Sequence, residues 1–206
     1  RPDIIESLSN HGFLVTNTFD MSYLENKSHY LEGTGSMILD RVSKKAYACI
    51  SSRTTSEALS VFSNTMNYEI IDFRSTTKIP IYHTNVMMSI GEDTALVCFD
   101  AIKEKEICSQ LKMELNDSGR TVINLSIDQM NNFLGNALEV RNKKDEKYLL
   151  MSETAKKSLT DEQERMIEDR LKLLSFPIPT IEKYGGGSVR CMLAEIFLGK
   201  TEQNDN

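Results

Sequence analysis

The sequence predicts an α/β fold built from repeated ββαβ units that close into a ring. About 40% of the 206 residues are apolar and 26% are charged, which is typical of a chain that buries a core. Hairpin-like strand pairs are each followed by a helical pattern and a further strand. The leading strands of successive units start roughly fifty residues apart, the spacing of a repeat architecture.

The first two units have the same order of elements. In each, two apolar runs flank a short polar turn, and a segment with helical spacing leads to a third apolar run. The first unit has strands at 36–42 and 45–51, a helix at 55–66 and a strand at 68–74; the second has strands at 85–90 and 94–100, a helix at 103–115 and a strand at 120–126.

The third unit has the same order and a fourth begins after it. The third has strands at 137–142 and 147–152, a helix at 160–174 and a strand at 178–184, and residues 189–198 open the fourth. Residues 2–12 have the pattern of an amphipathic helix that starts without an initiator methionine, which suggests a fragment.

The ring predicts where the polar residues of the leading strands lie. Equivalent positions in a pseudo-symmetric ring face its centre, so the starts of these strands should converge. The strands are equivalent near Ser36, Met87, Leu138 and Met192, and the polar or reactive residues just before or on them are Glu32, His83, Asn136 and Cys191. These four side chains should meet in one site.

Cys191 and His83 have the chemistry of a nucleophile and an acid/base. Cys191 follows three glycines, 185–187, which let a ligand approach the backbone. A thiolate attacks carbon, and a histidine donates a proton to the leaving group and later takes one from water. The structural alternatives are a buried core cysteine and a hydrogen-bonded histidine at the start of a strand.

Glu32 and Arg53 are the charged candidates. Glu32 precedes a Gly-x-Gly turn, and a carboxylate there needs a cationic or N–H-rich partner if it is buried. Arg53 lies between a strand and a helix, where it could bind a carboxylate through two parallel hydrogen bonds. The alternatives are a surface turn glutamate and a surface ion pair.

Composition and spacing argue against several partners. A net charge of −6 without a clustered basic surface argues against nucleic acid. No long apolar run or signal pattern indicates membrane insertion or secretion, so a cytoplasmic protein is expected. The four cysteines lack metal-ligand spacing, and no dinucleotide-binding glycine motif is present, so neither a metal nor another cofactor is expected.

Four short motifs resemble the guanidine-modifying superfamily of arginine deiminases, dimethylarginine hydrolases and amidinotransferases. They are "LEGTGS" at 31–36, "SSRT" at 51–54, "YHTNVMM" at 82–88 and "GGGSVRCM" at 185–192. The resemblance covers essentially the whole chain and is greatest to the bacterial branch of arginine-deiminase-related or citrulline-utilisation hydrolases. It implies a five-bladed α/β propeller, or pentein, of which residues 1–206 would form a single C-terminal domain with about two N-terminal blades absent.

The resemblance also implies roles for the candidate residues. Cys191 would be the nucleophile, His83 the general acid/base and Glu32 the carboxylate that holds the guanidino or ureido head. Arg53 would bind the α-carboxylate of the substrate, and Gly186 and Gly187 would let the loop close over the planar head. Arginine deiminases usually carry a second carboxylate two residues after the histidine, where this chain has Asn85.

A neutral amide at this position favours a citrulline-like substrate. The expected function is therefore a cysteine-dependent hydrolase that acts on a C–N bond of citrulline or arginine through a covalent thio-intermediate. An amidinotransferase and a non-catalytic binding module remain alternatives. A small guanidino or ureido amino acid is the expected partner, and an N-terminal fragment of the same protein and a homo-oligomer are possible partners.

Overall fold

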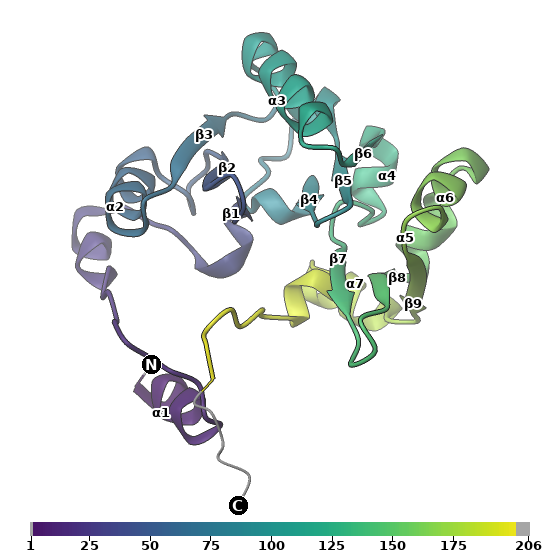
Figure 1. The fold of residues 1–206 in the computed structure, drawn as a ribbon. Helices are drawn as coiled ribbons and strands as arrows, with labels where there is room; N and C mark the ends of the chain where they lie inside the picture. Colours follow the sequence, from purple (N-terminus) through teal and green to yellow (C-terminus); the bar gives the residue numbers. More distant parts are fainter. Residues whose placement is uncertain (1, 201–206) are drawn as a thin grey trace, which may run out of the picture.

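The computed structural model describes residues 2–200, and within them the chain forms three ββαβ units. Each unit contains one three-stranded sheet in which the first two strands pair antiparallel and the second and third pair parallel. The units are arranged in an arc, with their helices on the outside and their first strands facing inwards (Figure 1). The predicted mixed α/β fold and its repeat are confirmed.

The first unit lies close to its predicted boundaries. It consists of strands β1 (Met37–Asp40) and β2 (Lys45–Cys49), helix α2 (Ser56–Met66) and strand β3 (Glu69–Phe73). The side chain of Thr55 caps α2 by accepting a hydrogen bond from the Ala58 amide. Asn67 ends the helix in the left-handed conformation that asparagine tolerates.

The second unit also follows its prediction. It consists of strands β4 (Met88–Ile90) and β5 (Thr94–Val97), helix α3 (Lys105–Asp117) and strand β6 (Thr121–Asn124). A further short helix, α4 (Ile127–Asn131), which the apolar pattern did not reveal, begins at a capping box between Ser126 and Gln129.

The third unit corrects two predictions. Its strands β7 (Leu138–Arg141) and β8 (Lys147–Ser152) are as expected, but the helix expected at 160–174 is the shorter α6 (Asp161–Glu168), and a helix that was not predicted, α5 (Glu153–Ser158), precedes it. The third strand is β9 (Lys172–Phe176), which pairs with β8. The apolar residues of 171–174 suit a helix and a strand equally, and the parallel pairing with β8 decides for the strand.

The predictions for the last two strands are wrong. Residues 178–184 are mostly helix α7 (Pro179–Gly185), because Pro179 stands at its first turn, where a proline fits. Residues 189–198 begin with a 3₁₀ turn, Val189–Met192, and continue without a strand. A strand needs a hydrogen-bonded neighbour, and among residues 2–200 this segment pairs with none.

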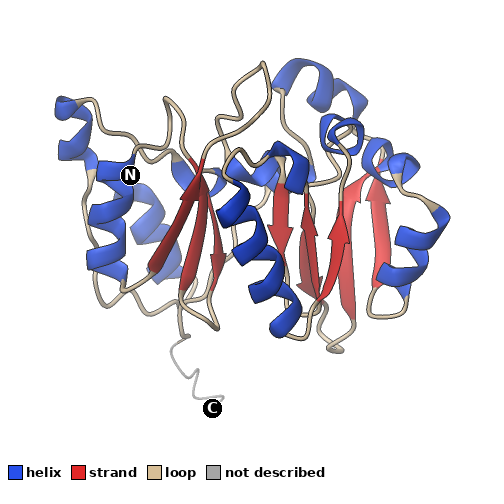
Figure 2. Cartoon of the chain, turned by 90° about the horizontal axis from the view of Figure 1, so that it is seen from above, coloured by secondary structure: helices blue, strands red, loops and turns tan. Residues whose placement is uncertain are grey.

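The two ends of the described chain lie together. Helix α1 (Pro2–Asn10) is confirmed, and Phe13 forms an antiparallel bridge with Lys200. A 3₁₀ turn, Ser22–Lys27, leads from this region to the first unit. Figure 2, turned by 90° from Figure 1, shows the strands of the three sheets running roughly along one axis, with helices around them.

The core joins the three units. The largest cluster of buried apolar residues runs from the strands of the first unit through the second unit into β8 and α6 of the third. Cys49 and Cys98 are part of it, and burial raises the pKa of each thiol to about 11. Both cysteines are therefore unreactive core residues.

Candidate active site

Three of the predicted site residues lie just before the leading strands of the three units, and Cys191 lies in a turn after the third unit. Glu32 precedes the 3₁₀ turn Gly33–Gly35 that leads into β1, and His83 precedes the turn Thr84–Val86 that leads into β4. Asn136 lies just before β7, and Cys191 lies in the 3₁₀ turn that follows α7. Strand β1 contacts β4, and β4 contacts β7, so the starts of these strands lie next to one another.

Glu32, His83 and Arg53 form one cluster. The Oε2 atom of Glu32 lies 3.1 Å from His83 Nε2 and 3.5 Å from Arg53 Nη1. The guanidinium of Arg53 also stacks over the ring of Tyr82, 4.6 Å from its centroid. Half of the Glu32 side chain is exposed, so this carboxylate can contact a ligand as well as its two protein partners.

Cys191 forms a second cluster with two asparagine amides. Asn136 Nδ2 donates to Cys191 Sγ at 3.2 Å, and Asn85 Nδ2 lies 3.6 Å from the same sulfur. Both asparagines are buried, whereas Cys191 is exposed. The cysteine is therefore accessible on one side and held by polar side chains on the other.

Gly35 brings the two clusters into contact. A Cβ atom placed on Gly35 would lie 3.1 Å from His83 Nδ1 and 3.1 Å from Asn85 Nδ2, so both side chains pack against this glycine. Its lack of a side chain lets the histidine of one cluster and the amide of the other lie side by side. Through Gly35, contacts run without a break from Glu32 to Cys191.

The three glycines of residues 185–187 have separate roles in the structure. Gly185 is the last residue of α7, and Gly186 caps that helix in the left-handed conformation, with a φ of 67°. The amide of Gly186 donates back to the helix, and its carbonyl accepts from Tyr82 Oη at 3.3 Å. Gly187 packs against Cys191, because a Cβ placed there would lie 3.0 Å from Sγ.

Glu182 supports this loop and was missed by the sequence analysis. Its carboxylate accepts from Ser188 Oγ at 2.8 Å and from Thr154 Oγ1 at 2.7 Å, and the residue is buried. The sequence analysis expected a strand at 178–184, whereas these residues form helix α7, which places the Glu182 carboxylate within hydrogen-bonding distance of Ser188. The buried carboxylate is satisfied by two hydroxyl donors and fixes the segment that leads to Cys191.

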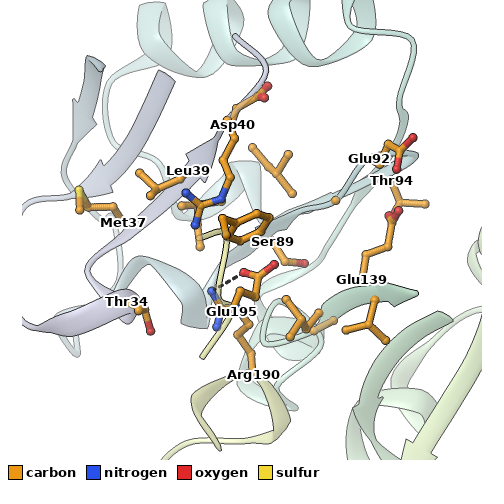
Figure 3. Close-up of a pocket in the computed structure, with 18 of the residues that line it drawn as sticks. Thr34, Met37, Leu39, Asp40, Ser89, Glu92, Thr94, Glu139, Arg190 and Glu195 are labelled. Atoms are coloured by element: carbon orange, nitrogen blue, oxygen red, sulfur yellow. Dashed lines mark hydrogen bonds and ion pairs between the residues drawn. The ribbon is translucent and has the colours of Figure 1, made fainter. Parts of the chain in front are cut away.

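A cavity of about 740 Å³ lies beside the site, between the inner strands β1, β4 and β7. Figure 3 shows that charged side chains line it, among them Arg190, whose Nη2 pairs with Glu195 at 3.3 Å. The buried ion pair of Asp40 with Arg120 forms one wall. Glu32 lines a separate cavity of about 350 Å³.

Neither a metal cluster nor a membrane-spanning helix is found in the part of the chain that the structure describes. No group of three or more histidine, cysteine or acidic side chains among residues 2–200 could hold a metal ion. In the same residues, no helix is both long enough and apolar enough to cross a membrane.

Comparisons with solved structures show the fold. The apo structure of ArgZ, an arginine dihydrolase from the ornithine-ammonia cycle in Cyanobacteria, matches with a TM-score of 0.67 and 16% identity over 93% of this chain and 27% of that one. The N-terminal domain of an ArgZ variant covalently bound to a reaction intermediate matches with a TM-score of 0.66 and 18% identity, over 93% and 63%. SxtG, an amidinotransferase from Microseira wollei, matches with a TM-score of 0.57 and 11% identity, over 93% and 55%.

The chain thus spans less than two thirds of each of these proteins. No curated protein sequence matches the chain. The family described as N,N dimethylarginine dimethylhydrolase, eukaryotic, matches residues 1–198, which is nearly the whole sequence. Together with the ββαβ units, this match shows that the chain belongs to the N,N dimethylarginine dimethylhydrolase family, within the guanidine-modifying pentein superfamily.

Proposed function

We propose that the protein is a cysteine-dependent hydrolase that acts on a C–N bond of a guanidino or ureido amino acid, with citrulline as its preferred substrate. The observation that carries the proposal is the contact of Cys191 with two neutral amides, Asn85 and Asn136. The family and the ArgZ domain with its covalent intermediate support hydrolysis through the cysteine.

The reaction begins with attack of the Cys191 thiolate on the central carbon of the substrate head. His83 donates a proton to the departing nitrogen, which leaves as a neutral amine, and a thio-intermediate remains on the enzyme. His83 then takes a proton from water, and the resulting hydroxide attacks the same carbon and releases the sulfur. For citrulline, ornithine leaves in the first step, and one water releases the carbamoyl group from the sulfur as carbamic acid, which breaks down to ammonia and carbon dioxide.

Glu32 and Arg53 have binding roles in this scheme. Glu32 contacts His83 Nε2, so the carboxylate holds the imidazole ring and stabilises its protonated form during the reaction. Its exposed portion can accept hydrogen bonds from the planar head of the substrate. Arg53 lies beside it and offers a guanidinium for the α-carboxylate.

Asn85 decides between substrates in this proposal. A carboxylate at this position would attract a guanidinium, whereas an amide can donate to or accept from a neutral ureido group. A partly desolvated charge contact is worth several kcal/mol, roughly enough to reverse a preference between two amino acids of the same shape. The wild-type protein is therefore expected to favour citrulline over arginine.

The test compares kcat/KM of the full-length protein for citrulline, arginine and N,N-dimethylarginine. Wild type should favour citrulline, and Asn85→Asp should shift the ratio towards the two cationic substrates. Faster use of arginine or dimethylarginine by the wild type would refute the substrate preference. Alkylation of Cys191 should abolish turnover, and turnover that survives it would refute the cysteine mechanism.

The fate of the intermediate separates hydrolysis from transfer. Ornithine should form at the same rate with and without an added acceptor amine such as glycine. With arginine as the donor, a glycine-dependent amidino product would instead favour the amidinotransferase alternative. A protein that binds these amino acids without turnover of any of them would favour the binding module.

A further inference from the structure

Asn136 is buried against the sulfur that the proposed reaction uses, yet the reaction as proposed gives it no role. Its exposed fraction is 1%, and its side-chain nitrogen reaches Cys191 Sγ at 3.2 Å. The same nitrogen donates to the backbone carbonyl of Asn85 at 2.9 Å. An amide nitrogen carries two hydrogens, so Asn136 can make both contacts at once.

The carbonyl of Asn85 determines which way the Asn136 amide points. If the amide were turned over, its oxygen would face the carbonyl oxygen of Asn85, and two acceptors would meet without a hydrogen between them. The nitrogen must therefore face both the carbonyl and the sulfur. A backbone carbonyl of the neighbouring unit therefore fixes the orientation of the Asn136 amide, so that its nitrogen points towards Cys191.

The backbone around Asn136 is held in place by close contacts. A Cβ atom on Gly135 would lie 2.6 Å from the carbonyl oxygen of Val86, so only glycine lets this segment pack so closely on the second unit. Phe133 adopts a φ of 65°, a conformation that non-glycine residues rarely take. These features position Asn136 with little freedom to move.

Asn136 also contacts the segment that carries the cysteine. The amide of Arg190 donates to the backbone carbonyl of Asn136 at 3.4 Å, so Asn136 holds the residue before Cys191 as well as the sulfur itself. The side-chain oxygens of Asn85 and Asn136 are buried and have no partner among the described residues. Such unsatisfied atoms are rare in folded proteins and call for an explanation beyond stability.

We propose that Asn136 is a further residue of the reaction, which holds the Cys191 sulfur as a thiolate in its attacking position, with Asn85 as a weaker second donor. A neutral thiol is a poor hydrogen-bond acceptor, whereas an anionic sulfur gains strongly from an N–H donor at this distance. The unsatisfied oxygens follow from turning both nitrogens towards the sulfur. The inference rests on the proposed cysteine chemistry, but its test does not require turnover.

The test measures the rate at which iodoacetamide alkylates Cys191 at pH 7 in the full-length protein, followed by mass spectrometry of the peptide that contains it. In this reaction the thiolate displaces iodide, and no substrate is needed. Asn136→Ala should slow alkylation about tenfold, the effect of losing one hydrogen bond to a reacting anion. Asn136→Asp keeps the shape of the side chain but brings a negative charge to the sulfur, so it should slow alkylation further.

Ser89→Ala is the matched control. Ser89 is also buried in β4, and its hydroxyl has no partner among the described residues, so it makes no hydrogen bond to the sulfur. This variant should alkylate at the wild-type rate. Circular dichroism melts of all variants identify any that fail to fold. If Asn136→Asp does not fold, the alkylation rate of Asn136→Ala decides the test.

Two results would overturn the inference. One is a folded Asn136→Ala protein whose Cys191 is alkylated at the wild-type rate. The other is an Asn136→Asp protein that is alkylated as fast as the wild type, which is expected if the Asn136 side chain only fills space. With substrate, Asn136→Ala should lower kcat about tenfold or more and change KM less than about twofold. A further outcome is that the wild type turns over none of the substrates while Cys191 is still alkylated fastest in the wild type, more slowly in Asn136→Ala and slowest in Asn136→Asp. In that case the proposed function is refuted and this inference stands.

Discussion

The three consecutive glycines should respond differently to alanine, because each has different surroundings. A Cβ on Gly185 meets only Ile181 Cγ2, at an ordinary distance of 3.8 Å, and Gly185 is the last residue of α7. Gly185→Ala should therefore stabilise the protein by about 0.5 kcal/mol. Gly186→Ala should destabilise it by about 1 kcal/mol, because Gly186 has a φ of 67°.

Gly187→Ala should instead affect the reaction. The new Cβ would lie 3.0 Å from Cys191 Sγ and 3.1 Å from its Cβ, tighter than nine in ten real contacts, so the cysteine must shift by a few tenths of an ångström. Because a misplacement of about 1 Å costs roughly 100-fold in rate, a shift of this size should lower kcat about 4- to 10-fold. Gly187 is not among the residues with positive φ, so its backbone accepts alanine.

The assay measures urea unfolding, the alkylation rate of Cys191 and kcat for each variant. Only Gly187→Ala should lose reactivity while keeping wild-type stability, and Gly185→Ala is its matched control. Equal kcat values and alkylation rates in these two variants would refute the reasoning. A loss in Gly185→Ala as large as that in Gly187→Ala would show that the loop, rather than the contact with the sulfur, matters.

Three further predictions concern the charged residues Arg53, Arg120 and Glu182. Arg53→Ala should raise KM about tenfold, a value reduced for the half-exposed guanidinium, and leave the alkylation rate of Cys191 unchanged; an unchanged KM would remove Arg53 from the site. Arg120→Ala should destabilise the protein by about 3 kcal/mol at pH 7, because it leaves Asp40 charged and buried. Burial raises the pKa of Asp40, but the hydrogen bonds and charge of Arg120 outweigh it and hold the pKa below 3.8. The contribution of this pair is therefore present above pH 3.8 and lost as the pH falls through the folded-state pKa, so urea titrations should show a smaller difference between the two proteins in acid than at pH 7. Glu182→Ala should lower stability by about 1–3 kcal/mol, since the buried hydroxyl of Ser188 and the half-buried hydroxyl of Thr154 lose their acceptor; a Glu182→Ala protein that unfolds at the same urea concentration as Glu182→Gln would contradict this.

The repeat and the positions of the main candidate residues could be predicted from the amino-acid sequence alone. Strand and helix periodicities are local properties, so the boundaries of the first two units could be predicted from runs of apolar residues. The phase of the repeat then placed Glu32, His83, Asn136 and Cys191 at equivalent points, and the structure brings these points together. Their catalytic roles stay predictions.

The contacts within the site and the secondary structure of residues 171–198 depend on tertiary packing and could not be predicted from the sequence. The leucine-rich run 171–174 suits a helix and a strand alike, and pairing with β8 makes residues 172–174 part of a strand. The same holds for the hydrogen bonds of Asn136, whose donor points at Cys191 because a backbone carbonyl from another unit accepts its second hydrogen. Contacts between residues about fifty positions apart leave no local pattern in a sequence, because they depend on how the units pack.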